Sequence, residues 1–252
     1  MHEDRATIRR LVGDVPVEPL GAGLDHRVYA VGDSLVARFG EGAAREAALL
    51  AAIAPRLPLR VPVPIAVDAD AGCLVQPRVA GTPLLDLPRG ARRAFAPHLL
   101  AFADALHALD PGVDVPVDDG ALEEWLDEAR ATWAAVHDEV PVGRRGAVEA
   151  VLASPVPARR APRALIHGDL GAEHVFVDAG RITGVIDWGD AVIGDPALDH
   201  GRLMRDLGPI TKGGERARLY AVCTALEDLA FGLEAGRDAY RTNALAALDE
   251  LM

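Results

Sequence analysis

The segment from Leu165 to Gly189 constrains the fold more than any other part of the chain. A short apolar run ends at Asp169, and His174 follows five residues later, at the start of a second apolar run. The residues 178–180, Asp-Ala-Gly, are a turn signal between two β-type runs and predict a hairpin that ends at Asp187. Because a hairpin brings its two ends together, we expect His174 and Asp187 to lie side by side, with Asp169 facing them.

Two side chains able to bind a metal ion and one carboxylate base would then face a single opening. Phosphoryl transfer from a magnesium nucleotide needs such a set, because its catalysis depends on positioning and on charge neutralisation. Each motif alone has an ordinary explanation: a turn at His-Gly-Asp, a core histidine at position 174, a strand cap at Asp187. Their conjunction across one hairpin favours the functional interpretation over these single-motif explanations.

The His-Gly-Asp motif at 167–169, together with His174, resembles the catalytic loop of the aminoglycoside phosphotransferase family, a branch of the protein-kinase-like fold. The Asp-Trp-Gly motif at 187–189 is similar to the metal-binding Asp-x-Gly turn of that fold. The family normally has Asn where this chain has His174, but macrolide phosphotransferases of the same superfamily have His there.

The resemblance implies a role for each matching residue. Asp169 would be the catalytic base, and His174 and Asp187 would bind magnesium, directly or through water. Because imidazole is a poorer ligand for magnesium than an amide oxygen, we expect manganese to serve at least as well. His167 and Asp195 would support the catalytic loop without touching substrate.

The resemblance also implies an α+β, two-lobed architecture. Residues 1–80 would form a small N-lobe with a five-stranded antiparallel sheet and one main helix, and residues 81–252 a larger, mostly helical C-lobe. The last two strands of the sheet are expected at 61–67 and 72–79. Apolar periodicity predicts C-lobe helices at Arg92–Ala108, Ala121–His137, Arg144–Leu152, Pro196–Leu207, Arg216–Leu233 and Asp238–Leu251.

A nucleotide site, for ATP or GTP, is expected in the N-lobe. Gly21 and Gly23 lie in the first hairpin turn, where backbone amides could approach a phosphate. The fold usually has a lysine on its third strand, but the only lysine here is the distant Lys212. The resemblance therefore implies that Arg38 reaches the phosphates and pairs with Glu46 on the next helix.

The hinge between the lobes would supply backbone groups for the nucleotide base, around Gln76 and Val79. Pro77 removes one amide donor from this stretch. Both adenine and guanine bind through hinge backbone, so the choice between ATP and GTP stays open.

Composition excludes some functions. The net charge of −12 falls almost entirely in residues 81–252, which argues against nucleic-acid binding and is compatible with a cationic small molecule. Cys73 and Cys223 lie far apart without a partner spacing, as expected in a reducing cytoplasm. No apolar run approaches a membrane span. We expect a cytoplasmic monomer or weak homodimer without membrane or nucleic-acid partners.

The acceptor is expected to be a hydroxyl of a small molecule. Acids that could hold an amino group of that molecule are Asp190, Glu227, Asp228 and Glu234, although an acid in such a position is more often a solvated helix or turn charge. The resemblance favours an antibiotic of aminoglycoside or macrolide type, and hence antibiotic resistance. The same fold also serves small-metabolite kinases with choline, homoserine or amino-sugar-like acceptors.

Two other classes of function remain open at this stage. One is a nucleotide-binding pseudoenzyme, which His174 and the absence of an N-lobe lysine would allow. The other is a metal-dependent hydrolase that would use His167, Asp169, His174 and Asp187 as ligands. A hydrolase would not need Arg38.

Overall fold

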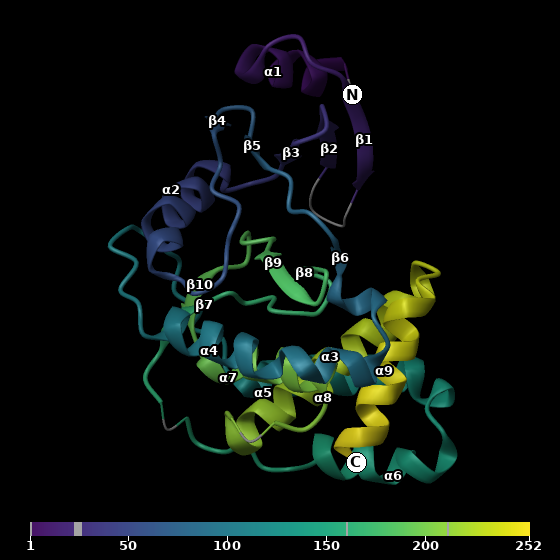
Figure 1. The fold of residues 1–252 in the computed structure, drawn as a ribbon. Helices are drawn as coiled ribbons and strands as arrows, with labels where there is room; N and C mark the ends of the chain where they lie inside the picture. Colours follow the sequence, from purple (N-terminus) through teal and green to yellow (C-terminus); the bar gives the residue numbers. More distant parts are fainter. Residues whose placement is uncertain (1, 23–26, 160, 211) are drawn as a thin grey trace.

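The computed structural model describes residues 2–22, 27–159, 161–210 and 212–252 (Figure 1). A five-stranded antiparallel sheet in the order β1-β2-β3-β5-β4 lies at the top of Figure 1, and a mainly helical lobe lies below it. The predicted two-lobed α+β fold is confirmed. The strands of this sheet are β1 (Val17–Ala22), β2 (Arg27–Val31), β3 (Leu35–Phe39), β4 (Ala66–Asp68) and β5 (Cys73–Pro77).

The helices of the sheet lobe are α1 (His2–Val12) and α2 (Ala43–Ile53), and both pack on β4 and β5. Helix α1 was not expected from the sequence. Its Ile8 is fully buried and packs in a small core with Tyr29 and Phe39 of the sheet. A single apolar face, flanked by acids in the first turn and arginines in the last, is enough to explain this helix.

The helical lobe contains seven α-helices within the described residues (Figure 1). They are α3 (Arg89–Arg92), α4 (Ala96–His107), α5 (Leu122–Val136), α6 (Val142–Leu152), α7 (Pro196–Leu207), α8 (Gly214–Glu234) and α9 (Asp238–Leu251). Short 3-10 helices occur at Ala54–Arg56, Leu84–Asp86, Arg93–Phe95 and His137–Glu139.

Two predicted elements are wrong in detail, and proline explains both. Of the predicted strand at 61–67, only the last two residues join the sheet, in β4 (Ala66–Asp68), since Pro62 and Pro64 cannot donate ladder hydrogen bonds. The predicted helix over 92–108 is interrupted, and α4 begins with Pro97 in its first turn, where the missing amide is not needed.

The predicted hairpin lies between the two lobes, at the centre of Figure 1. Its strands β8 (Val175–Asp178) and β9 (Arg181–Val185) form a small sheet with β6 (Thr82–Pro83). A second small sheet joins β7 (Ala164–Ile166), which leads into the His-Gly-Asp motif, to β10 (Val192–Gly194).

The hairpin turn is a two-residue loop. Ala179 and Gly180 have φ angles of 46° and 75°, the signature of a type I′ turn, whose twist matches that of the flanking strands. The pairing continues beyond the strands, since the Ile186 amide donates to the His174 carbonyl oxygen at 2.9 Å. This register pairs residue 174 with residue 186, so that residue 187 is the neighbour of that pair.

The chain crosses between the lobes against the same hairpin. Thr183 Oγ1 donates to the Ala80 carbonyl oxygen at 2.6 Å. Gly81 has a φ of +99°, and a Cβ there would lie 2.3 Å from the Val177 carbonyl oxygen, so this crossing requires glycine.

Helix α7 is buried along its whole length, although it contains five charged or titratable residues. It packs mainly on α8, and also on α4 and α9. Gly201 allows the close approach to α8, because a Cβ there would lie 2.6 Å from Tyr220 Cβ and 2.8 Å from the Ala217 carbonyl oxygen.

No helix in the described ranges combines the length and the apolar character that crossing a membrane would need.

We predict that Gly201→Ala lowers the free energy of unfolding by about 1–3 kcal/mol, because overpacking against the α8 backbone outweighs the better helix propensity of alanine. The matched control is Gly146→Ala in α6, where a Cβ meets nothing within 4 Å and alanine should add up to about 1 kcal/mol. Urea denaturation measures both variants. Equal stabilities would contradict the close-packing explanation.

Candidate active site

The loop after β7 and the end of the hairpin bring three predicted side chains together. His174 Nδ1 lies 3.4 Å from Asp169 Oδ2, and His174 Nε2 lies 3.6 Å from Asp187 Oδ2. All three side chains are partly exposed, between 17% and 37%, so solvent reaches each of them.

A backbone contact orients the ring of His174. Its Nδ1 lies 2.9 Å from the Asp169 carbonyl oxygen, which can only accept, so Nδ1 carries a proton. In the neutral ring the lone pair is then on Nε2, which faces Asp187. Burial disfavours the charged ring, but Asp169, Glu173 and Asp187 outweigh it and raise the pKa of His174.

Both ring nitrogens of His167 form hydrogen bonds with the backbone. The Asp169 amide donates to its Nδ1 at 3.2 Å, so the proton is on Nε2, which donates to the Ile186 carbonyl oxygen at 3.0 Å. Burial lowers the pKa of His167 and keeps the ring neutral. With both nitrogens bonded, His167 has no lone pair for a metal, which argues against the hydrolase alternative.

Asp187 occupies a sparsely populated backbone conformation, with a φ of +64°. Such residues cost free energy and cluster at functional sites, where the surrounding structure fixes them. Here the following residue, Trp188, is buried between Phe102 and His167 and donates from Nε1 to the Val185 carbonyl oxygen.

Arg38 of β3 joins the two lobes. One nitrogen of its guanidinium contacts Glu46 of α2, and another contacts Asp187. The Arg38–Glu46 contact that the family resemblance implied is therefore present in the structure. Burial lowers the pKa of Arg38, but an arginine stays charged, and its Nε has no hydrogen-bond partner in the described residues.

The side chain that supports the catalytic loop is Asp199, and the prediction of Asp195 for this role is wrong. The Asp199 carboxylate accepts from the amides of His167 and Gly168, each at 3.0 Å, and contacts His107 Nε2 at 2.9 Å. Burial disfavours its charge, but the contact with His107 and these amides outweigh it and lower the pKa of Asp199.

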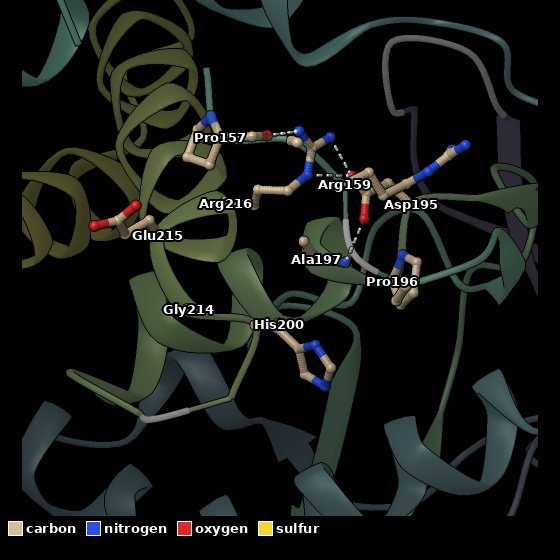
Figure 2. A pocket seen from close by; sticks show the side chains of 12 residues that line it. Pro157, Arg159, Asp195, Pro196, Ala197, His200, Gly214, Glu215 and Arg216 are labelled. Carbon is tan, nitrogen blue, oxygen red and sulfur yellow. Dashed lines mark hydrogen bonds and ion pairs between the residues drawn. The ribbon is translucent and has the colours of Figure 1, made fainter. Parts of the chain in front are cut away.

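Asp195 instead stabilises the start of α7. Its side chain accepts from the Ala197 amide as an N-cap and pairs with Arg216 of α8, as Figure 2 shows. Both residues line a cavity of about 650 Å³, of which Pro157 and His200 are also part. None of the three catalytic-loop and hairpin side chains described above lines this cavity.

Three further charged side chains of α7 contact the loop. Arg202 Nε donates to the Gly168 carbonyl oxygen at 3.1 Å, and its Nη1 lies 2.8 Å from Asp169 Oδ1. The Asp206 carboxylate accepts from the Ala172 amide at 2.7 Å. Arg205 contacts Glu173 at 3.1 Å.

These charges set the protonation state of Asp169. Burial alone would favour the neutral acid, but Arg202 and then His174 outweigh it, and the pKa of Asp169 falls to about 2. Asp169 is therefore a carboxylate throughout the physiological range.

The donor set fits a divalent cation. A carboxylate oxygen of Asp187 and an imidazole nitrogen of His174 at 3.6 Å can both reach one ion, since such bonds are about 2.0–2.2 Å long. Within the described residues, Asp169, Glu173 and His174 also offer ligand atoms within 4.8 Å of one another. Glu173 already pairs with Arg205, which leaves it less available.

The predicted nucleotide residues are only partly placed. Gly23 lies outside the described residues, and Gly21 is in β1 at an irregularity of the β1–β2 ladder. Gln76 is buried in β5, and its Oε1 has no hydrogen-bond partner in the described part of the chain. Val79 follows β5 and packs on the hairpin, where a Cβ on Gly184 would lie 3.0 Å from its side chain.

The four predicted acceptor acids separate into different environments. Asp190 is exposed, and its backbone packs against Gly168. Partial desolvation of its carboxyl, followed by the charges of Asp169 and Asp187, raises the pKa of Asp190. Glu227 is 59% exposed and lies 3.8 Å from Arg202 Nη2. Both therefore lie near Asp169.

Asp228 and Glu234 do not share that position. Asp228 is buried and pairs with Arg205 at 3.0 Å, so its role as an acceptor ligand is not supported by its surroundings. Burial, together with the neighbouring Glu173, raises the pKa of Asp228. Glu234 is exposed at the end of α8, about 10 Å along the helix axis from Glu227.

Sequence reasoning missed Asp199, Arg202 and Asp206, yet a signal was present. The three residues follow one another at helical spacing within Pro196–Leu207, a helix whose bounds the sequence predicted correctly. Charged residues that recur on one face of a helix after such a motif could have been predicted to contact the loop of that motif.

Fold and site together place the chain among two-lobed, protein-kinase-like proteins. The model of the phosphotransferase enzyme family matches residues 16–241, so the chain belongs to that family. The resemblance inferred from the His-Gly-Asp and Asp-Trp-Gly motifs is thereby confirmed.

Two curated relatives have named activities. Viomycin phosphotransferase of Streptomyces vinaceus is 30% identical over 159 residues, which cover 57% of this chain and 55% of the relative. Hygromycin-B 4-O-kinase of Escherichia coli is 54% identical over 33 residues, or 13% of this chain and 10% of the relative. The chain thus spans about half the length, or less, of these curated relatives.

Solved structures match over almost the whole chain. Aminoglycoside 2′-phosphotransferase-IIIa in its GDP complex has a TM-score of 0.68 at 22% identity, covering 99% of this chain and 96% of that one. Macrolide 2′-phosphotransferase of Brachybacterium faecium has a TM-score of 0.56 at 25% identity, covering 98% and 97%. The first similarity shows the fold alone.

We predict that Asp199→Ala destabilises the protein by several kcal/mol, since each buried amide left unpaired costs about 1–3 kcal/mol. Hydrogen exchange at the amides of His167 and Gly168 should also accelerate. The contrast variant is Asp195→Ala, which removes a helix cap worth about 1 kcal/mol together with the partner of Arg216, and which should leave exchange at these amides unchanged.

The pH dependence has a definite sign. Because the pKa of Asp199 is lowered in the folded protein, its stabilising contribution is present above the unfolded value of about 3.9 and is lost as pH falls below it. The stability gap between wild type and Asp199→Ala should therefore shrink at acid pH. Faster loop exchange in Asp195→Ala than in Asp199→Ala would contradict the assignment.

Proposed function

We propose that the chain transfers the γ-phosphate of ATP or GTP to a hydroxyl of a small molecule, most favourably an antibiotic of aminoglycoside, macrolide or related type. The observation that carries the proposal is the convergence of the partly exposed side chains of Asp169, His174 and Asp187, with Asp187 bridged by Arg38 to the sheet lobe. Family membership and the named activities of the relatives support it.

In this mechanism the chain mainly positions groups and neutralises charge. Asp169 accepts a hydrogen bond from the acceptor hydroxyl and takes its proton late in the transfer. A pKa of about 2 makes Asp169 a weak base, which suits a loose transition state in which the proton moves late.

Asp187 and His174 would hold a magnesium or manganese ion, which supplies charge neutralisation at the phosphates when it is bound. Arg38 orients Asp187 and brings a positive charge to the same place. Residues 1–80 would form the nucleotide lobe, and residues 81–252 the catalytic and acceptor lobe. The purine base of the nucleotide would bind near Gln76 and Val79.

The acceptor side is proposed to be acidic. Asp190 packs against Gly168, and Glu227 lies 3.8 Å from Arg202 Nη2, so both would attract an ammonium group of the acceptor towards Asp169. Kanamycin and GDP are bound in a solved aminoglycoside phosphotransferase of the same fold, which supports both ligand classes. The two free, buried cysteines fit the predicted cytoplasmic location.

The test is an assay of ADP and GDP release with magnesium or manganese, against aminoglycosides, macrolides, cyclic peptide antibiotics and small amino alcohols. Release stimulated by one chemical group, with phosphate recovered on that acceptor, supports the proposal and names the class. Stimulation by amino alcohols alone would favour the small-metabolite kinase. Nucleotide binding without transfer to any acceptor would favour the pseudoenzyme.

We predict that Asp169→Asn lowers kcat by about 10²–10⁴-fold, the range for a positioned general base, while the nucleotide dissociation constant changes little. Steady-state kinetics and calorimetry measure the two quantities. Asp178→Asn, at the exposed end of β8, is the matched control and should retain wild-type kcat. Wild-type turnover by Asp169→Asn would remove Asp169 from the reaction.

We also predict that His174→Ala weakens Mn²⁺ binding to the nucleotide complex by at least about tenfold, the lower end of the range for residues around metal sites. The free Mn²⁺ signal in electron paramagnetic resonance measures this without turnover. His98→Ala, an exposed histidine of α4, is the control. Unchanged Mn²⁺ affinity in His174→Ala would exclude His174 from the metal site.

A further inference from the structure

Arg202 connects the buried helix α7 to the reacting end of the catalytic loop. Its side chain is only 10% exposed, and it contacts two successive loop residues. Nε donates to the Gly168 carbonyl oxygen at 3.1 Å, and Nη1 lies 2.8 Å from Asp169 Oδ1. A planar guanidinium that makes both contacts restricts the backbone and the carboxylate of the loop at once.

The contact with Arg202 distinguishes the two oxygens of Asp169. Oδ1, which faces Arg202, is buried from solvent. Oδ2 lies on the side of His174, at 3.4 Å from its Nδ1. Because the Asp169 side chain as a whole is 23% exposed, Oδ2 is the oxygen that is left to meet a hydroxyl from solvent.

The other terminal nitrogen of the Arg202 guanidinium makes a third contact. Arg202 Nη2 lies 3.8 Å from Glu227 Oε2 of α8, and Glu227 is largely exposed. Arg202 is thus situated between the base and an acid on the side from which an acceptor would approach. The anchor of the arrangement is Asp199, one turn earlier on α7, which contacts the amides of the same loop.

We propose that Arg202 is a positioning residue for phosphoryl transfer, which holds the Asp169 carboxylate so that Oδ2 faces the acceptor hydroxyl. This inference rests on the proposed function of Asp169. Misplacement of a reacting group by about 1 Å can cost about 10²-fold in rate, which sets the size of the expected effect.

The alternative is that Arg202 only stabilises the packing of α7 and α8. That role would affect the free energy of unfolding and leave the turnover of the folded enzyme unchanged. The two possibilities therefore differ in kcat, in the retention of substrate affinity, and in what a lysine at this position can restore.

The experiment compares Arg202→Met, Arg202→Lys and wild type. Arg202→Met keeps an unbranched stem but loses both contacts, and we expect kcat to fall about 10–100-fold, with the KM for nucleotide within about twofold of wild type. Arg202→Lys has one ammonium group, which can restore one of the two contacts, and should recover part of kcat.

The matched control is Arg130→Met. Arg130 of α5 also contacts one carboxylate and one backbone carbonyl, those of Asp127 and Leu152, but away from the loop. It should lose stability and keep wild-type kcat. Wild-type kcat in Arg202→Met, or a loss matched by Arg130→Met at equal stability, would overturn the proposal.

A structural readout separates this inference from the proposed function. In a crystal structure of substrate-free Arg202→Met, the Asp169 carboxylate should leave the position that it has in the wild-type protein. An unchanged carboxylate overturns the inference whatever the activity. Absence of transfer by wild type on every acceptor overturns the proposed function instead. If Arg202→Met does not fold, Arg202→Lys and Arg202→Gln provide the same two readouts.

Discussion

The site depends on one carboxylate, that of Asp199, which accepts from the amides of His167 and Gly168. These amides belong to a loop that has left its strand, so no sheet ladder is available to pair them. A buried carboxylate that accepts two amides and contacts His107 is strongly stabilised in its charged form. The same contact fixes the loop from which Asp169 projects, and so the position of the Asp169 carboxylate follows from it.

Further charged side chains on the same face of α7 also contact the backbone of the loop. Arg202 and Asp206 follow Asp199 at helical spacing, and each contacts the next part of the loop. Burying so many charges would be costly if they were unpaired, which is why Arg205 lies among Glu173, Asp206 and Asp228. The ion pairs of Arg202 and Arg205 therefore stabilise the buried helix and orient the loop at the same time.

Arg38 extends this support to the other lobe. It contacts Glu46 of its own lobe and Asp187 of the hairpin, so the sheet, its helix and the metal-capable acid share one guanidinium. Asp187 has a sparsely populated, positive φ, and the residue that follows it, Trp188, is buried and anchors this part of the chain. Reorientation of the lobes would have to break this contact, which links nucleotide-side residues to the residues next to Asp169.

The sequence by itself determined the hairpin, the proximity of His174 to Asp187 and the bounds of α7 and α9, because turn chemistry and apolar periodicity act locally. It also determined the family, since its motifs are contiguous. Only the tertiary structure decided that Asp199 and not Asp195 supports the loop, and that Asp228 is an internal ion-pair partner. Two acids on one helix have the same local propensities, and which of them meets the loop depends on how α7 packs against segments distant in the chain.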